Sequence, residues 1–128
     1  MSGMSDYLEN EILDHILGTG SYTMPSNVYI ALSTGSFGDD NSGTELSGSG
    51  YARQAITFAA ASSASAASNA TVTFPTATGS WGAISHYGIY DASTSGNLLI
   101  HGAFAASKTI GSGDVLRVNS GDLTVTAA

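Results

Sequence analysis

The chain contains no cysteine among its 128 residues, and it carries little charge of either sign. Without thiols, neither a disulfide framework nor a thiolate metal site is available, so stability has to come from packing and backbone hydrogen bonds. Only 3 residues are Lys or Arg against 10 Asp and Glu, which gives a formal net charge of −7. That charge repels phosphate and anionic lipid, and this argues against direct binding to nucleic acid or to a membrane.

Long apolar runs are also missing. No stretch approaches the ~20 apolar residues that a membrane-spanning helix needs. The acidic N-terminal segment also lacks the apolar core of a signal peptide. We therefore expect synthesis in the cytoplasm, with any export following another route.

Small residues fill the place of charged ones, because Ala, Ser, Thr and Gly make up more than half of the chain. The hydrophobic fraction of 42% is that of a folded protein, and the length fits one domain with its own core. Surfaces of small side chains and hydroxyls suit lasting contact with neighbouring molecules better than catalysis. The composition thus predicts a component of an assembly.

The net charge is confined to the first part of the chain. All acids before residue 50 lie between Asp6 and Glu45, with no Lys or Arg among them. After residue 50, three aspartates balance Arg53, Lys108 and Arg117. Identical copies held close together would therefore repel one another unless partners or cations compensate.

One helix is predicted, over residues 5–18, after a flexible tail at 1–4. Ser5 or Asp6 serves as N-cap, and Gly18 supplies the stop. A helix of about a dozen residues is marginal alone in water, so it must dock, either on its own sheet, which we favour, or on a neighbouring subunit. The residues expected on the apolar side are Leu8, Ile12, Leu13, Ile16 and Leu17.

Residues 19–128 alternate with period two, which predicts a mainly β fold: a single-domain antiparallel β-sandwich of about seven to eight strands. Within 84–90, strict alternation places Ile84, His86 and Tyr90 on one face. Two loops are long, at 33–50 and 59–70, and long loops in small domains tend to be contact elements. The strands are expected near 28–32, 52–58, 72–74, 84–90, 98–104, 115–118 and 123–125.

Two groups of residues suggest metal binding without completing a site. Asp39, Asp40, Asn41 and Glu45 supply oxygens around Gly43, but their spacing is not that of an EF-hand loop, so a solvated acidic loop is favoured. His86 and His101 fall on consecutive predicted strands, yet no third ligand stands at a suitable spacing, and His15 lies far off in the helix. We predict neither a metal nor another cofactor.

No catalytic motif is evident. The chain has no Gly-x-Ser-x-Gly nucleophile elbow and no phosphate-binding glycine loop with its lysine. Its carboxylates fall in the helix or at turns rather than as a facing pair on strands. We therefore predict that the protein is not an enzyme.

The candidate interaction residues include the large aromatic side chains and the rare basic ones. Trp81, Tyr87, Tyr90 and Phe104 are large aromatic anchors that could stack on sugars, although core packing at the Trp81-Gly82 corner is favoured. Arg53 and Arg117 are rare cations, for which we expect ion pairs to an acidic group, such as the helix of a neighbouring copy. The candidate set is Arg53, Arg117, Trp81, Tyr87, Tyr90, Leu8, Ile12 and Ile16.

Several segments together resemble a family of small tailed-bacteriophage virion structural proteins, often labelled tail fibre proteins. The resemblance covers nearly the whole chain from Ser5 onward, and it rests on turns and strand starts, so it implies a fold more than a task. The segments are SDYLEN at 5–10, ILDH at 12–15, VYIAL at 28–32, SGYARQ at 49–54, SWG at 80–82, HYGIYD at 86–91, GNLL at 96–99 and GDLTVT at 121–126.

This resemblance implies a non-enzymatic virion protein. We favour a capsid decoration (cement) protein that bridges capsomers, because the chain is small and has no fibre-shaft repeat. The alternatives are a tail or tail-fibre-associated structural or adaptor protein, and a carbohydrate-binding module for host attachment. The expected partners are the major capsid protein or other virion proteins and further copies of the chain, a trimer being one arrangement. A host glycan joins them in the tail-associated case.

Overall fold

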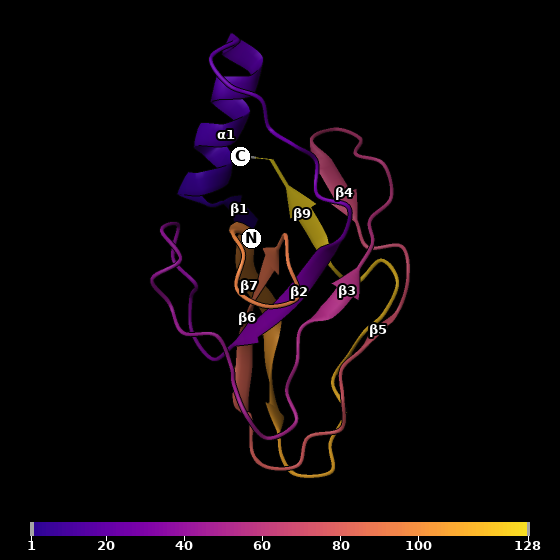
Figure 1. The fold of residues 1–128 in the computed structure, drawn as a ribbon. Helices are drawn as coiled ribbons and strands as arrows, with labels where there is room; N and C mark the ends of the chain where they lie inside the picture. The colour runs from indigo at the N-terminus through magenta and orange to yellow at the C-terminus, as the bar shows by residue number, and fades with distance from the viewer. Residues whose placement is uncertain (1, 128) are drawn as a thin grey trace.

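Nine strands and one helix follow one another in the computed structural model, which describes residues 2–127 (Figure 1). The mainly β architecture with one N-terminal helix and a sandwich-like arrangement confirms the predicted fold class. The elements are β1 (Ser2–Met4), α1 (Asp6–Leu17), β2 (Val28–Ser33), β3 (Gln54–Ile56), β4 (Ser65–Ala67), β5 (Val72–Thr73), β6 (Gly82–Tyr90), β7 (Leu98–Ile110), β8 (Arg117–Val118) and β9 (Thr124–Thr126).

The main sheet has five antiparallel strands in the order β1-β7-β6-β2-β3. Its centre is the β6–β7 hairpin, which is closed at one end by the 91–97 turn. The Asp91 carboxylate accepts hydrogen bonds from both the backbone and the side-chain amide of Asn97, at 2.8 and 3.1 Å. An Asp side chain that satisfies turn amides in this way explains why the chain reverses here.

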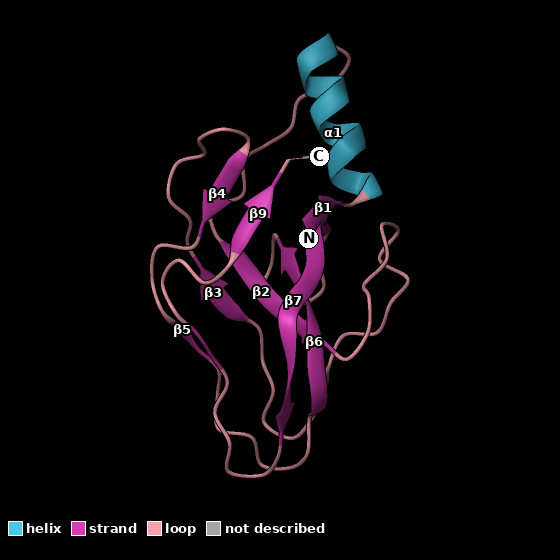
Figure 2. Cartoon of the chain, turned by 180° about the vertical axis from the view of Figure 1, so that it is seen from behind, coloured by secondary structure: helices cyan, strands magenta, loops and turns pink. Residues whose placement is uncertain are grey.

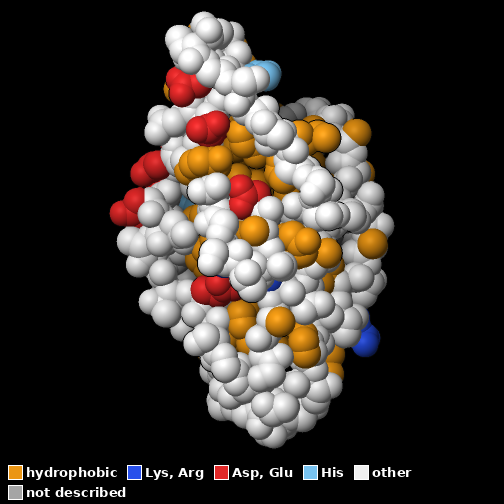
Figure 3. Space-filling model, in the orientation of Figure 1, with side chains coloured by type: hydrophobic (Ala, Val, Ile, Leu, Met, Phe, Trp, Pro, Cys, Tyr) orange, Lys and Arg blue, Asp and Glu red, His pale blue; other side chains and the backbone are white. Residues whose placement is uncertain are grey.

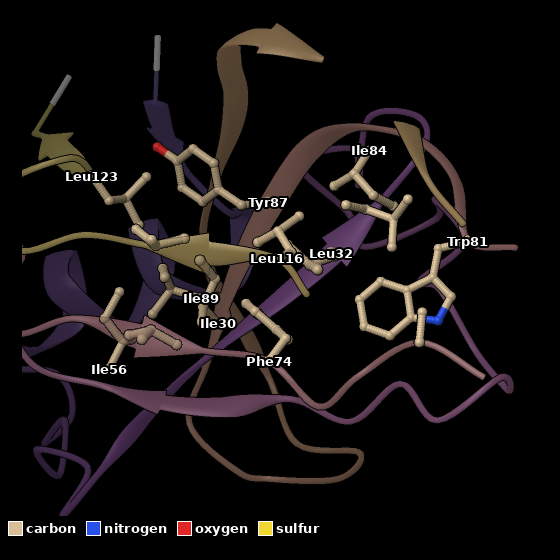
Figure 4. Packing of buried hydrophobic residues seen from close by; sticks show 14 residues of the cluster. Ile30, Leu32, Ile56, Phe74, Trp81, Ile84, Tyr87, Ile89, Leu116 and Leu123 are labelled. Atoms are coloured by element: carbon tan, nitrogen blue, oxygen red, sulfur yellow. The ribbon is translucent and has the colours of Figure 1, made fainter. Parts of the chain in front are cut away.

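Two short ladders, β4-β9 and β5-β8, cover one face of the main sheet (Figure 2). The principal core lies between these layers, where Ile30, Leu32, Tyr87 and Ile89 of the main sheet pack in one cluster with Leu116 and Leu123 (Figure 4). Alternation along β2 and β6 places the main-sheet side chains on the covered face. Phe74, Ile56, Trp81, Ile84 and Val118 complete most of the cluster.

A smaller core lies on the opposite face of the main sheet. It joins Phe37 from the 33–50 loop to Ala31, Tyr90 and Leu98. The Phe37 ring meets the Tyr90 ring edge-on, with centroids 6.0 Å apart. The long loop is therefore anchored over this face of the sheet rather than free in solvent.

Strand β6 departs from simple alternation. The register with β7 shifts between Ile84 and His86, so that Ser85 faces several residues of β7. As a result Ile84 joins Tyr87 and Ile89 in the principal core, whereas the sequence analysis put it with His86 on the other face. The irregular register explains this difference, because an unpaired residue in a strand moves the side chains that follow it to the other face of the sheet.

Two other expectations need adjustment. Residues 2–4, predicted as part of a flexible tail, form β1 and pair antiparallel with β7 at residues 100–102; Met1 lies outside the described residues. The 59–70 segment, expected as a long loop, contains the short strand β4, which pairs with β9. β1 is an edge strand of the main sheet and β4 belongs to a two-stranded ladder, and each pairs over only three residues, too few for a strong sequence pattern.

Candidate interaction surface

Helix α1 is fixed to the sheet at its N-terminal end. The backbone amide of Ser5 donates to the Leu99 carbonyl at 2.8 Å, and its buried hydroxyl donates to the Leu98 carbonyl. The same hydroxyl oxygen accepts from the Leu8 amide at 3.2 Å, so Ser5 is both the N-cap and the attachment point. At the other end Gly18 adopts φ +79°, and its amide donates to the Asp14 carbonyl.

The rest of the helix projects beyond the sheet (Figure 1). Leu8 is buried and Ile12 is half-buried, but Leu13, Ile16 and Leu17 are 55%, 70% and 71% exposed. The favoured expectation that α1 docks on its own sheet therefore holds for its first turns only. Its last two turns present an apolar face to solvent. Among residues 2–127, no helix is long and apolar enough to cross a membrane.

Arg53 forms an internal network. Its Nη2 and Nε atoms bind the two carboxylate oxygens of Glu45 at 2.8 and 2.9 Å, and Nη1 donates to the carbonyls of Ala92 and Ser95 at 2.9 and 2.7 Å. The guanidinium also lies over the Tyr90 ring, 3.7 Å from its centroid. The expected ion pair of Arg53 is thus made within the chain, and it joins the 33–50 loop to the 91–97 turn.

Tyr51 extends this network into the core. Its hydroxyl donates to the Glu45 carboxylate at 2.5 Å and accepts from the Leu32 amide at 3.1 Å. Burial and the hydrogen bond to Glu45 raise the pKa of Tyr51 far above its usual range. Burial works to lower the pKa of Arg53, but Glu45 outweighs it, and the net direction is upward. Tyr51 is therefore neutral and Arg53 charged at physiological pH.

Three of the four aromatic candidates are buried, and the fourth, Phe104, is half-buried. Trp81, Tyr87 and Tyr90 are each 3% exposed. The Trp81 indole donates to the Ser49 carbonyl at 2.9 Å and packs edge-on against the Tyr51 ring. This corrects their place among surface interaction residues, since a sugar cannot stack on rings that the core covers. The favoured alternative, core packing at the Trp81-Gly82 corner, agrees with the structure.

Arg117 lies beside an open hollow that we call the β7 groove. Its Nε donates to the Thr73 hydroxyl at 3.4 Å, a weak contact, and the side chain is exposed. The groove has a volume of about 230 Å³ and a mostly apolar lining. Its lining residues are Ile84, Phe104, Ala105, Ala106, Lys108, Leu116, Arg117, Val118 and Asp122.

The oxygen-bearing residues of the 33–50 loop each interact with a different partner. Asp39 pairs with the His101 imidazole at 2.6 Å, Asp40 accepts from the Ser42 amide at 3.1 Å, and Asn41 accepts from the Tyr90 hydroxyl at 2.7 Å. His86 contacts the Ser85 hydroxyl at 2.7 Å. Within residues 2–127, no group of three or more His, Cys, Asp or Glu side chains is placed to hold a metal ion.

Sequence reasoning missed Glu45, Tyr51 and Phe37 as organising residues. Glu45 was assigned to the acidic loop, although it stands close before Arg53, the only cation in the first hundred residues. That scarcity was a usable signal, because a lone Arg that becomes buried must find an acid nearby. Phe37 offered a weaker signal as the one aromatic residue of a polar loop.

A comparison with protein families matches most of the chain. The model of the family described as "Podophage GP4 fiber I protein gp80" matches residues 3–126. No curated protein matches the chain.

Proposed function

Because the chain belongs to the Podophage GP4 fiber I protein gp80 family, we propose that it is a structural component of the tail or tail fibre of a phage particle. The match over residues 3–126 carries this proposal, since it spans the helix, the sheet and both long loops. The family description favours the fibre alternative over the capsid decoration protein that the sequence analysis preferred.

The task we assign is mechanical rather than chemical. The ionisable groups of the network around Arg53 are used to fasten loops to the sheet, and Glu45, Arg53 and Tyr51 satisfy one another. Such internally paired groups stabilise a fold but are not free to act on a substrate. The proposed partners are other virion proteins and further copies of the chain.

Attachment to host glycans is not part of the proposal. Of the aromatic rings considered for sugar stacking, Trp81, Tyr87 and Tyr90 lie in the core, and Phe104 is half-buried against the Tyr87 ring. A glycan contact would have to use mainly small and polar side chains. No contact or cavity of the described residues favours that function over a structural one.

Labelling of intact particles tests the proposal. Antibody raised against this protein, followed by electron microscopy, is expected to mark the tail or its fibres. A label spread over the outside of the head would instead support capsid decoration. A deletion phage separates the two independently: loss of a fibre part should impair adsorption, and loss of a cement protein should lower the resistance of heads to heat.

A further inference from the structure

The exposed face of α1 combines apolar and acidic side chains. Leu13, Ile16 and Leu17 form its apolar part. Glu9 is exposed and precedes Leu13 by four residues and Ile16 by seven, so these three share one side of the helix. A large apolar face beside a carboxylate, left open to water, is typical of an interaction surface.

The β7 groove is apolar like the exposed face of α1, but the charged side chains beside it are basic rather than acidic. Phe104, Leu116 and Val118 line it with apolar surface, while Lys108 and Arg117 stand exposed beside it. One water takes about 30 Å³ of liquid volume, so a hollow of about 230 Å³ admits whole aliphatic side chains. The Asp122 carboxylate on the lining accepts from the Asn119 amide at 3.2 Å and belongs to that turn.

These two cations form no ion pair with an acidic side chain of residues 2–127. Within residues 2–127, the ion pairs engage Arg53 with Glu45 and His101 with Asp39, and neither Lys108 nor Arg117 takes part in one. In a chain with 3 Lys and Arg and a net charge of −7, both remaining cations border a single hollow. That placement fits an acidic, apolar occupant.

The helix of the same chain cannot be this occupant. Ser5 holds α1 beside Leu98 and Leu99, whereas the groove lies near 104–108, roughly 20 Å further along β7 at ~3.3 Å per residue. The helix also projects away from the sheet (Figure 2). Figure 3 shows acidic side chains near the helix end and along one flank, and a Lys or Arg side chain at the opposite flank lower down.

We propose that the exposed face of α1 in one copy docks into the β7 groove of a second copy. Leu13 and Ile16 then enter the apolar hollow, and Glu9 meets Lys108 and Arg117 at its rim. The two surfaces are different, so the contact is head-to-tail and either closes into a ring or continues as a row of copies. This inference does not depend on whether the protein belongs to the tail or the head.

Sedimentation velocity over a range of protein concentrations tests the contact. The wild-type protein in low salt should shift from monomer to a closed oligomer or a growing series, and Ile16→Ser should weaken this association about tenfold or more. Met24→Ser is the matched control, because Met24 is 81% exposed but lies outside the helix, and it should associate like wild type. Equal weakening by both variants, or a wild-type protein that stays monomeric throughout, overturns the proposal.

A charge exchange tests the partner surface. Glu9→Lys alone and Lys108→Glu alone should each weaken association, and their combination should recover it, since opposite charges then meet again. Arg117→Ala should weaken association without lowering the unfolding temperature of dilute monomer. Failure of the double variant to recover association, with each single variant still folded, overturns the proposal.

Discussion

The guanidinium of Arg53 lies 3.7 Å from the centroid of the Tyr90 ring and binds both carboxylate oxygens of Glu45. One side chain therefore connects the second core, the 33–50 loop and the 91–97 turn. Because the Arg53 side chain is only 7% exposed, its charge depends on Glu45 for compensation.

Removal of either charge from this pair should be costly. Arg53→Met and Glu45→Gln should each lower the free energy of unfolding by about 3 kcal/mol, since each leaves a poorly solvated partner uncompensated. Arg53→Lys should recover little of the loss, because an ammonium cannot replace the planar fork or its stacking on Tyr90. Urea denaturation measures all three, and a near-normal Lys variant would contradict the assigned geometry.

The raised pKa of Tyr51 should make the folded protein lose stability at alkaline pH. The unfolded chain loses the phenolic proton first, near the ordinary pKa of 10.0. The stabilisation is complete below pH 10 and declines as the pH rises above it, because the folded state then binds more protons than the unfolded state. Tyr51→Phe should be less stable at pH 7 but should show a shallower decline above pH 10 in denaturation measurements. An unchanged slope would count against the buried hydroxyl.

Gly43 should resist substitution for steric reasons. A Cβ atom built there would lie 2.1 Å from the Ser36 carbonyl oxygen and 2.6 Å from the Phe37 Cα atom. Gly43→Ala should therefore displace the loop and cost about 1–3 kcal/mol or more. Gly35→Ala is the control, since nothing lies within 4 Å of its added Cβ. Thermal unfolding compares the two, and equal effects would place the cost in backbone freedom instead.

The attachment of α1 should depend on one hydroxyl. Ser5→Ala removes both the cap on the Leu8 amide and the bond to the Leu98 carbonyl, and should cost about 1–2 kcal/mol. Hydrogen exchange should quicken first in the helix, because its later turns have few other contacts. Ser21→Ala, at an exposed position after the helix, should leave both measurements unchanged.

Much of the fold could be predicted because it depends on local pattern. Alternation located the strands around Ile30, Ile89 and Val118, and the cap and stop residues bounded the helix. The features that sequence reasoning missed are non-local: a register shift at Ser85, and a three-residue strand formed at the N-terminus. Neither leaves a periodic signal, since each depends on which strand lies alongside.

The candidate site was harder to predict than the fold. Leu8, Ile12 and Ile16 are on one side of α1 as expected, but only contacts at its first turn reveal that the far part is exposed. The buried state of Trp81 and the pairing of Arg53 depend on loops that return from distant parts of the sequence. Residue type alone could not decide between core and surface for such side chains.

The irregular register of β7 affects how readily its outer edge can pair with a strand of another molecule. Within residues 2–127, β1 borders the outer side of β7 only at 100–102, and the strand then runs on unaccompanied. Between its pairings at Ala103 and Lys108 it takes four residues where β6 has one. An edge with an irregular register and an exposed lysine, Lys108, near its end is a poor template for the addition of another strand. The backbone of β7 beyond residue 102 is thus disfavoured as a site for β-strand pairing between molecules.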